Sequence, residues 1–299
     1  MLRWRLLLGT LFIGALAGLC WLDGHQALGT PPGAWLLPLA LVLSVIASDE
    51  MLRLIGTTDE KPVASIVSLG NLAIVASSGV VDFWPGRAAP PIPFERLAWP
   101  AAAVAIAVLA AFVGEMARYE RPGRVVVRVA LAALSFVYIG LFLSFVVQLR
   151  LFGSNLTGMT ALVSLIAVVK MGDSGAYTIG RLFGRHKMAP TLSPGKTWEG
   201  AIGAVMGAVL GAWLAFRLMP SDASAAAPAF RWGWIVYGVI VGVAGMLGDL
   251  AESLIKRDAG VKDSSPWMPG FGGVLDVLDS ILFAAPIAWL MWVCGVVQR

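Results

Sequence analysis

Long apolar blocks dominate this sequence, and the charged residues collect in the short stretches between them. Many of these blocks are as long as the roughly 20 helical residues that cross the hydrocarbon core of a bilayer. Hydrophobic residues make up 58% of the chain and charged residues 13%, whereas a soluble domain has about half and about a quarter. The pattern therefore predicts an all-α, polytopic bundle of transmembrane helices and excludes an ordinary soluble domain.

Hydrophobic length predicts about nine spans. The expected segments are residues 6–22, 34–55, 65–84, 98–117, 125–149, 156–180, 199–218, 233–255 and 272–297. The first segment resembles a signal peptide, but Leu19 is too bulky for the position before Cys20 in a lipoprotein cleavage site, so we interpret it as an uncleaved span. No linker separates soluble domains. We expect the N-terminal helices (1–151) and a C-terminal catalytic region (152–299) to form one continuous membrane domain.

Basic residues alternate between the loops and predict the topology of the chain. One face receives these groups: Arg3 and Arg5; Arg53 and Lys61; Arg118, Arg121 and Arg124; Arg181, Arg185, Lys187 and Lys196; Lys256, Arg257 and Lys262. The positive-inside rule makes that face cytoplasmic, with the N-terminus inside and the C-terminus outside. We expect a bacterial-type inner (cell) membrane protein. The modest net charge of +4 lies in loops, which indicates contact with membrane lipids rather than nucleic acid.

The cysteines and histidines of this sequence do not form a pattern that predicts a metal site or a catalytic site. Cys20 and Cys294 lie in apolar segments at opposite ends of the chain, which argues against a disulfide framework or a zinc site. His25 and His186 are isolated loop histidines without a partner pattern, which argues against zinc or histidine-based catalysis. We interpret Asp49 and Glu50 as an interfacial helix end and leave them out of the candidate site.

The first of three unusual polar segments contains Lys170 and Asp173, near the end of an apolar run. A charge at the centre of a span costs roughly 2.5–3.5 kcal/mol, so both side chains are expected to face protein or a wet cavity. One interpretation is a pair at helical spacing that neutralises itself. We favour a functional role, because the small residues at 172, 174 and 175 leave the backbone accessible beside the charges.

The second segment, residues 191–200, directly precedes a predicted span. Gly195, Lys196 and Thr197 resemble the end of a phosphate-binding P-loop, but Pro190 stands where its first glycine is required and no strand precedes it. Lys196 and the hydroxyls of Ser193 and Thr197 could still donate to a phosphate at the N-terminus of the next helix. A simple Ser or Thr helix cap is an equally open interpretation.

The third segment places acidic and basic side chains on the last two predicted spans. Asp249, Ser253 or Glu252, and Lys256 fall on one helical face, and Asp276 and Asp279 repeat the spacing of three just after Gly272 and Gly273. Carboxylates on two facing helices, with Lys and Arg between them, can hold Mg²⁺, which in turn binds phosphates. Incidental ion pairs in a solvated loop are the alternative, which the cost of four acids in or beside apolar spans disfavours.

With these residues in view, the chain resembles the CDP-diacylglycerol synthases, also called phosphatidate cytidylyltransferases. The closing signature of that family is matched, in order and spacing, by Ser253, Lys256, Arg257, Lys262, Asp263, Pro269, Gly272, Gly273, Asp276 and Asp279. The runs 173–177 and 193–200 are also similar, and the resemblance covers roughly residues 170–280. Phe271 and Val277 stand where the family usually has His and Arg, and each removes a hydrogen-bonding group.

The resemblance implies that CTP and phosphatidate react to give CDP-diacylglycerol and pyrophosphate in phospholipid biosynthesis. It implies Mg²⁺ ligands at Asp249 and Asp276, with Asp279 as a further ligand or support. Lys256 and Arg257 join the two aspartates as catalytic residues. The expected substrate-binding and phosphate-binding residues are Asp173, Ser193, Lys196, Thr197, Glu199, Ser253, Lys262, Asp263, Gly272 and Gly273. The phosphatidate oxygen is already anionic near neutral pH, so alignment and charge neutralisation suffice without a strong base.

Three alternatives stay open at this point. The first is a CDP-archaeol synthase-like enzyme that acts on an ether lipid. The second is a non-catalytic relative, and the third is a transporter whose intramembrane charges line a path. The clustering of the polar segments at one predicted membrane face argues against the transporter. A homodimer is compatible with the sequence.

Overall fold

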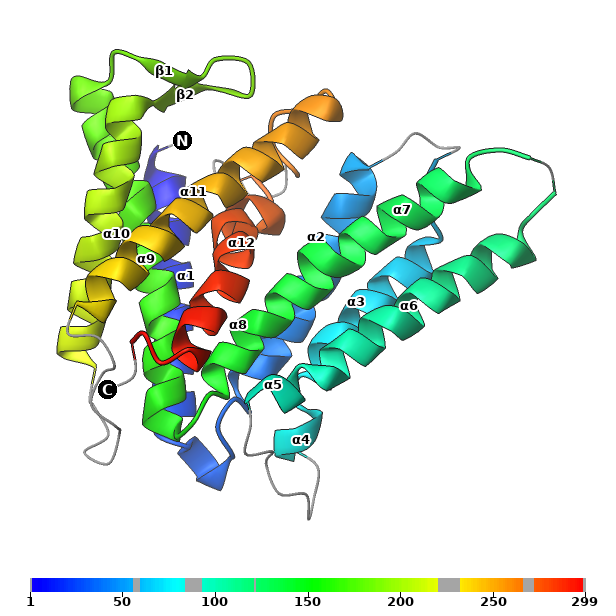
Figure 1. Ribbon diagram of the computed structural model, residues 1–299, viewed down its shortest axis with the longest axis horizontal. Helices are drawn as coiled ribbons and strands as arrows, with labels where there is room; N and C mark the ends of the chain where they lie inside the picture. Colours follow the sequence, from blue (N-terminus) through cyan, green and yellow to red (C-terminus); the bar gives the residue numbers. More distant parts are fainter. Residues whose placement is uncertain are drawn as a thin grey trace. The chain divides into compact units, whose positions relative to one another are not determined.

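The structure is a computed structural model that describes residues 2–55, 60–83, 93–120, 122–219, 232–265 and 272–297. Helices form nearly all of the regular structure, which confirms the predicted all-α class (Figure 1). The chain divides into two compact units. Unit 1 comprises Met1–Leu151 and Asp258–Val277, and unit 2 comprises Phe152–Arg257 and Leu278–Arg299. The expectation of one continuous membrane domain stays a prediction.

The helices follow the predicted spans closely in the second half of the chain. In unit 1 they are α1 (Leu2–Gly24), α2 (Leu36–Leu54), α3 (Ala64–Ser77), α4 (Val80–Phe83), α5 (Pro93–Arg96), α6 (Ala98–Ala117), α7 (Val125–Ser135) and α8 (Phe142–Arg150). A short 3₁₀ turn, η1 (Ala27–Gly29), and a π-helical turn, η2 (Phe136–Leu141), complete it. Unit 2 contains α9 (Asn155–Phe183), β1 (Lys187–Ala189), β2 (Ser193–Thr197), α10 (Trp198–Leu218) and most of α11 (Gly233–Asp258) and α12 (Val274–Val293).

Within the described residues, six helices are long and apolar enough to cross a membrane. They are Phe94–Ala117, Val125–Arg150, Asn155–Phe183, Trp198–Leu218, Gly233–Asp258 and Val274–Val293. The chain is therefore an integral membrane protein. The first three predicted spans form α1, α2 and α3, which are not among these six in the part of the chain that the structure describes, so the prediction of about nine spans is not confirmed.

A buried polar network holds the helices of unit 1 around the π-helical turn. The Asn71 amide nitrogen on α3 donates to the hydroxyls of Ser48 (2.8 Å) and Ser135 (3.0 Å), and its oxygen accepts from the Gly140 amide (3.1 Å). A π-turn shifts the helical hydrogen-bond register, and such turns often occur at functional positions. The packing is tight, because a Cβ at Gly140 would lie 2.7 Å from the Asn71 oxygen.

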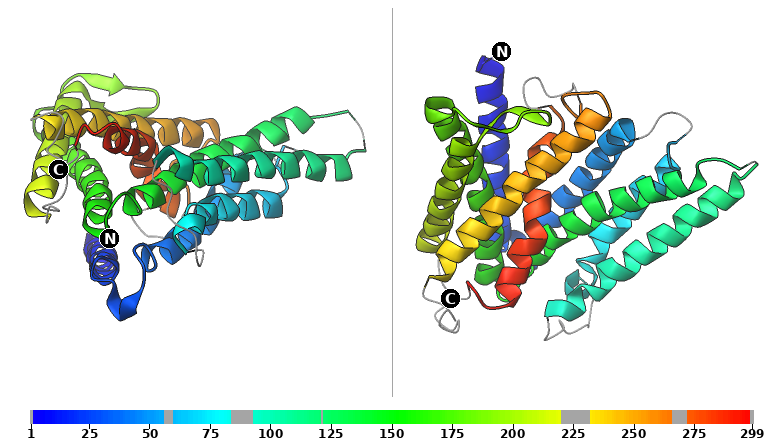
Figure 2. Two further views of the ribbon diagram at one scale, coloured as in Figure 1. Left: turned by 60° about the horizontal axis from the view of Figure 1, so that its bottom comes forward. Right: turned by 45° about the horizontal axis from the view of Figure 1, so that its top comes forward.

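Unit 2 is built around close contact between α9 and α10, which run beside one another in both views of Figure 2. Gly203, Gly207 and Gly211 repeat every four residues on α10. A Cβ on these glycines would lie 2.5, 2.3 and 2.5 Å from the carbonyl oxygens of Gly175, Met171 and Ala167. Small residues at this spacing let membrane helices approach through their backbones. A side chain on this face would push the two helices apart.

A β-hairpin that the sequence analysis did not predict joins α9 to α10. Its strands β1 and β2 are antiparallel, with Lys187 opposite Thr197 and Ala189 opposite Ser193. The residues compared with a P-loop therefore form strand β2, whose last residue Thr197 is the N-cap of α10.

Candidate active site

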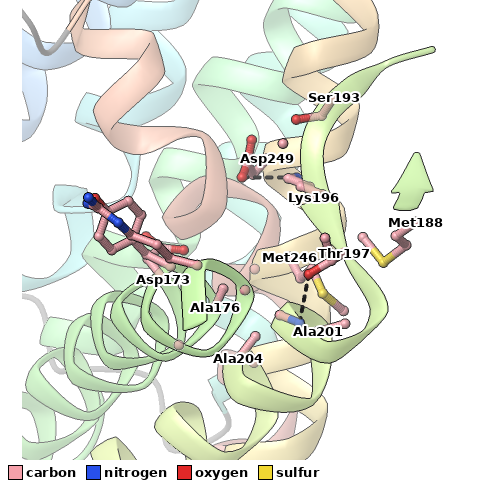
Figure 3. A pocket seen from close by; sticks show the side chains of 18 of the residues that line it. Asp173, Ala176, Met188, Ser193, Lys196, Thr197, Ala201, Ala204, Met246 and Asp249 are labelled. Carbon is pink, nitrogen blue, oxygen red and sulfur yellow. Dashed lines mark hydrogen bonds and ion pairs between the residues drawn. The ribbon is translucent and has the colours of Figure 1, made fainter. Parts of the chain in front are cut away.

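A cavity of about 590 Å³ lies within unit 2 and contains many of the residues singled out in the sequence (Figure 3). Its walls come from the C-terminal half of α9, the β-hairpin, the first two turns of α10 and the middle of α11. Of the predicted site residues, it brings together Asp173, Ser193, Lys196, Thr197 and Asp249. Small residues leave the space beside these polar groups: Gly172, Ala176, Gly180, Gly195, Gly200, Ala201, Ala204, Gly242 and Gly245.

The central polar contact of the cavity joins Lys196 on β2 to Asp249 on α11. The Lys196 ammonium lies 2.9 Å from Asp249 Oδ2, and Figure 3 shows the two side chains facing one another. The Lys196 side chain is 18% exposed and that of Asp249 is 41% exposed. A carboxylate and an ammonium therefore meet at the wall of a cavity that is open to ligands, with their mutual attraction offsetting part of their desolvation.

The predicted ion pair between Lys170 and Asp173 is present, whereas a functional role for these residues stays a prediction. The two side chains form the i,i+3 ion pair, with 3.3 Å between Nζ and Oδ2. Asp173 also lines the cavity, together with the exposed Tyr177 and Arg181 one and two turns further along α9. The Arg181 guanidinium donates to the Tyr177 hydroxyl at 2.5 Å. This places a second cation at the cavity, which the sequence analysis did not include in the site.

The hairpin residues have structural partners as well as places near the cavity. The Thr197 hydroxyl accepts a hydrogen bond from the Gly200 amide at 3.1 Å, so the helix-cap interpretation is confirmed. The Glu199 carboxylate accepts from the amides of Arg185 (3.1 Å) and His186 (3.2 Å) and lies 2.6 Å from the His186 ring. Glu199 therefore holds the start of the hairpin and contacts His186, a pairing that no sequence pattern indicated.

The polar stripe on α11 is confirmed as a single helical face. The fully buried Glu252 accepts from Lys256 at 2.8 Å, and Arg257 donates to the Leu192 carbonyl of the hairpin turn at 3.2 Å. The Ser253 hydroxyl lies 3.5 Å from Asp249 Oδ1, at the limit of a hydrogen bond. These contacts orient Lys256 and Arg257, the two basic residues that the sequence analysis assigned as catalytic.

Asp279 on α12 belongs to the acidic group of unit 2. Its side chain is buried, lies near Asp249 and Glu252, and accepts hydrogen bonds from the amide and hydroxyl of Ser280. Close approach of α11 and α12 at this level requires Gly248, where a Cβ would lie 2.7 Å from the Asp279 carbonyl. The two helices thereby bring Asp249 and Asp279 to the same region of unit 2.

The remaining signature residues lie in unit 1, around the first turn of α12. Asp276 Oδ2 accepts from the Ser264 amide (2.9 Å), the Ser264 hydroxyl (2.7 Å) and the Gly273 amide (2.8 Å). Gly272 has a φ of +82°, a conformation that L side chains rarely adopt. Lys262 and Asp263 are exposed. Pro269, Gly270 and Phe271 lie outside the described residues.

Glu50, which the sequence analysis left out of the candidate site, is a buried residue with partners at the start of α12. It is 2% exposed, and its carboxylate accepts from the Val274 amide (3.0 Å), the Leu275 amide (2.8 Å) and the Ser264 hydroxyl (3.2 Å). Glu50 is therefore buried against the start of α12, whereas its neighbour Asp49 is exposed and pairs with Arg53. The cost of a carboxylate in an apolar segment, which drew attention to Asp249, applies equally to Glu50.

The chemistry of the acidic side chains is compatible with a magnesium ion. Across the described ranges, no group of three or more His, Cys, Asp or Glu side chains is arranged to hold a metal by itself. Mg²⁺ usually takes only one or two protein carboxylates and completes its shell with water and substrate phosphate oxygens. Asp249 at the cavity wall and the nearby Asp279 meet that requirement in unit 2.

Comparison with known proteins identifies the family of the chain. The sequence model of the cytidylyltransferase family matches residues 5–294. The chain belongs to the cytidylyltransferase family. Cytidylyltransferase-family relatives named phosphatidate cytidylyltransferase include one from Haemophilus influenzae, 43% identical over 129 residues, or 43% of this chain and 44% of the relative.

Two further relatives with that name give the same result. The one from Brucella suis is 44% identical over 138 residues, or 46% of this chain and 48% of the relative. The one from Mycobacterium tuberculosis is 35% identical over 170 residues, or 57% of this chain and 49% of the relative. The cytidylyltransferase-family chain thus spans about half the length of the curated relatives that it matches.

Proposed function

We propose that this protein is a phosphatidate cytidylyltransferase, which converts CTP and phosphatidate into CDP-diacylglycerol and pyrophosphate for phospholipid biosynthesis. The observation that supports it most directly is the Lys196–Asp249 pair at a cavity of about 590 Å³ in a unit made of membrane-spanning helices. Membership of the cytidylyltransferase family and the names of the relatives agree with this chemistry.

In the proposed reaction, a phosphate oxygen of phosphatidate attacks the α-phosphorus of CTP. A new bond forms between this oxygen and the α-phosphorus. The bond between the α-phosphorus and the oxygen that bridges it to the β-phosphorus breaks, and pyrophosphate leaves with that electron pair. No strong base is needed because the attacking oxygen is already anionic. The protein contributes alignment and neutralisation of the phosphate charge.

The cations of the candidate site have the following proposed roles. Lys196 contacts the triphosphate, because its ammonium lies at the cavity wall and is released from Asp249 when phosphate oxygens approach. Arg181, an exposed residue that lines the cavity, contacts the lipid phosphate. Lys256, Arg257 and Lys262 supply further positive charge, and Ser193 and Thr197 complete the wall beside Lys196.

Mg²⁺ would supply charge neutralisation at the phosphates and link them to the carboxylates. Asp249, Asp276 and Asp279 remain the proposed ligands. The hydrogen bonds that Asp276 and Asp279 accept support this assignment, because metal-binding carboxylates are commonly oriented by such partners.

We place the site at the cytoplasmic face of an inner (cell) membrane. The C-terminal half of α9, the β-hairpin and the first two turns of α10 line one cavity, and these are the segments that the positive-inside rule assigns to the cytoplasm. Cytosolic CTP and a lipid headgroup could meet there. The hydrophobic surface of the helices contacts membrane lipids.

The proposal is tested by following the label of α-phosphate-labelled CTP. Purified protein in phospholipid nanodiscs is incubated with Mg²⁺ and either phosphatidate, its diether analogue or no added lipid. We expect labelled CDP-diacylglycerol and an equal amount of pyrophosphate only with phosphatidate. Preferential labelling of the diether product would change the lipid class. Nucleotide-independent solute flux in liposomes, without CTP turnover, would contradict the enzyme and indicate a transporter.

A further inference from the structure

The carboxylate of Glu50 is one of the most completely buried in unit 1. It lies on α2, far in sequence from the signature residues, yet its two oxygens accept from the amides of Val274 and Leu275 and from the Ser264 hydroxyl. The first amides of a helix have no carbonyl partner within the helix. Glu50 therefore satisfies two otherwise unpaired donors at the N-terminus of α12, where a negative charge is also favoured by the helix dipole.

Ser264 connects Glu50 to Asp276. Its hydroxyl lies within hydrogen-bond distance of Glu50 Oε2 (3.2 Å) and Asp276 Oδ2 (2.7 Å), and its amide donates to Asp276. Asp276 in turn accepts from the Gly273 amide, as the third helical residue does in a capping box. The carboxylates of Glu50 and Asp276 thus both bind Ser264 and the first residues of α12.

These contacts explain sterically why glycines occupy positions 272 and 273, directly before α12. A Cβ at Gly273 would lie 2.3 Å from Glu50 Oε2 and 2.1 Å from the Ser264 hydroxyl. A Cβ at Gly272 would lie 2.3 Å from Asp276 Oδ2, and Gly272 also has a positive φ. Any side chain at either position would displace one of the two carboxylates. The turn is therefore shaped around Glu50 and Asp276 together.

We propose that Glu50 is a positioning residue for Asp276. By fixing Ser264 and the first turn of α12, it restricts the Asp276 carboxylate to the orientation in which it acts on the phosphates of the substrate, directly or through Mg²⁺. The inference rests on the proposed function and extends it, because it gives α2 of the N-terminal half a part in the reaction.

The test compares Glu50→Gln with wild type and with the neighbouring control Asp49→Asn, whose native carboxylate is exposed and pairs with Arg53. Gln retains the shape of Glu but replaces one acceptor oxygen with an NH₂ donor that faces the helix amides. Hydrogen exchange by mass spectrometry is measured on full-length protein in nanodiscs, together with pyrophosphate release. Ser264→Ala, which removes one hydroxyl, is a milder second variant.

We expect Glu50→Gln to raise the rate of amide hydrogen exchange at residues 273–275 about 10-fold or more, because these amides lose a buried acceptor. The exchange rates of peptides from α9 should stay unchanged. We expect kcat to fall about 10-fold or more while KM for CTP changes less than about 3-fold, since misalignment affects the transition state more than binding. Ser264→Ala should show both effects more weakly, and Asp49→Asn should match wild type.

Faster exchange with an unchanged kcat would overturn the inference, since Glu50 would then be purely structural. Unchanged exchange in Glu50→Gln would overturn it as well, whatever the activity. If wild-type protein released no pyrophosphate, the proposed function would fail. The exchange comparison would then still decide whether Glu50 fixes the start of α12.

Discussion

Lys196 and Asp249 lie 2.9 Å apart across the candidate cavity, one on a β-strand and the other on a transmembrane helix. The sequence predicted a role for each but not that they are partners, since 53 positions of chain separate a hairpin from a span. Their pairing neutralises both charges when no substrate is present. In the proposed reaction, Lys196 binds the phosphates of a magnesium nucleotide and Asp249 binds its cation.

Replacing Lys196 with Ala should reduce kcat/KM for CTP about 10²-fold to 10³-fold, the loss typical for one charge-stabilising contact to a reacting group. Lys187→Ala is the matched control, because Lys187 lies on the other strand of the hairpin and is exposed. Initial rates of pyrophosphate release at several CTP concentrations give both values. Equal losses in the two variants would mean that general positive charge matters and that Lys196 has no special contact.

The Asp249→Asn and Asp276→Asn variants should each lose Mg²⁺-dependent transfer from labelled CTP by about 10²-fold or more, because Asn lacks the charge that a hard cation prefers. Chelation of Mg²⁺ should abolish the wild-type activity, and added Mg²⁺ should restore it. The variants must first be shown to be folded and inserted. Wild-type transfer by folded Asp249→Asn would rule out the metal assignment for that residue.

Sequence reasoning performed well where one local pattern determines the outcome. Helical spacing correctly placed Asp249, Ser253 and Lys256 on one face of α11, and the apolar blocks predicted the helices from α6 onwards. Thr197 was correctly considered as a helix cap.

Contacts between distant segments could not be predicted in this way. Glu50 and Ser264 are separated by most of the chain, and no local pattern indicates that they meet. The hairpin was missed because Ser193 to Thr197 contains Pro and Gly, which are poor strand formers, and its pairing depends on Lys187 to Ala189 across a turn. The count of nine spans is not confirmed, because α1, α2 and α3 are not among the helices that are long and apolar enough to cross a membrane in the described residues.

Gly207→Ala should destabilise unit 2, because the added Cβ would meet the Met171 carbonyl oxygen at 2.3 Å and force α9 and α10 apart. Overpacking of this kind costs about 1–3 kcal/mol. Gly14→Ala is the control, since no atom lies within 4 Å of a Cβ built there. Thermal unfolding in detergent should show a lower midpoint for Gly207→Ala alone. Equal midpoints would contradict backbone contact between the two helices.

Arg150→Met should destabilise unit 1 by about 3–5 kcal/mol, because it leaves the buried carboxylate of Asp23 without its cation. Arg150 Nε lies 2.5 Å from Asp23 Oδ2, and both side chains are almost fully buried. Asp23 also accepts from the Gly33 and Trp35 amides. Arg53→Met, which breaks the exposed pair with Asp49, should cost at most about 1 kcal/mol. Chemical denaturation that is unaffected by Arg150→Met would contradict a structural role for this pair.

The most direct test is the pyrophosphate released by purified wild-type protein in nanodiscs supplied with CTP, Mg²⁺ and phosphatidate. The account predicts release that requires all three additions and that matches CDP-diacylglycerol formation mole for mole. Folded, inserted protein that releases no pyrophosphate above the protein-free control would contradict it.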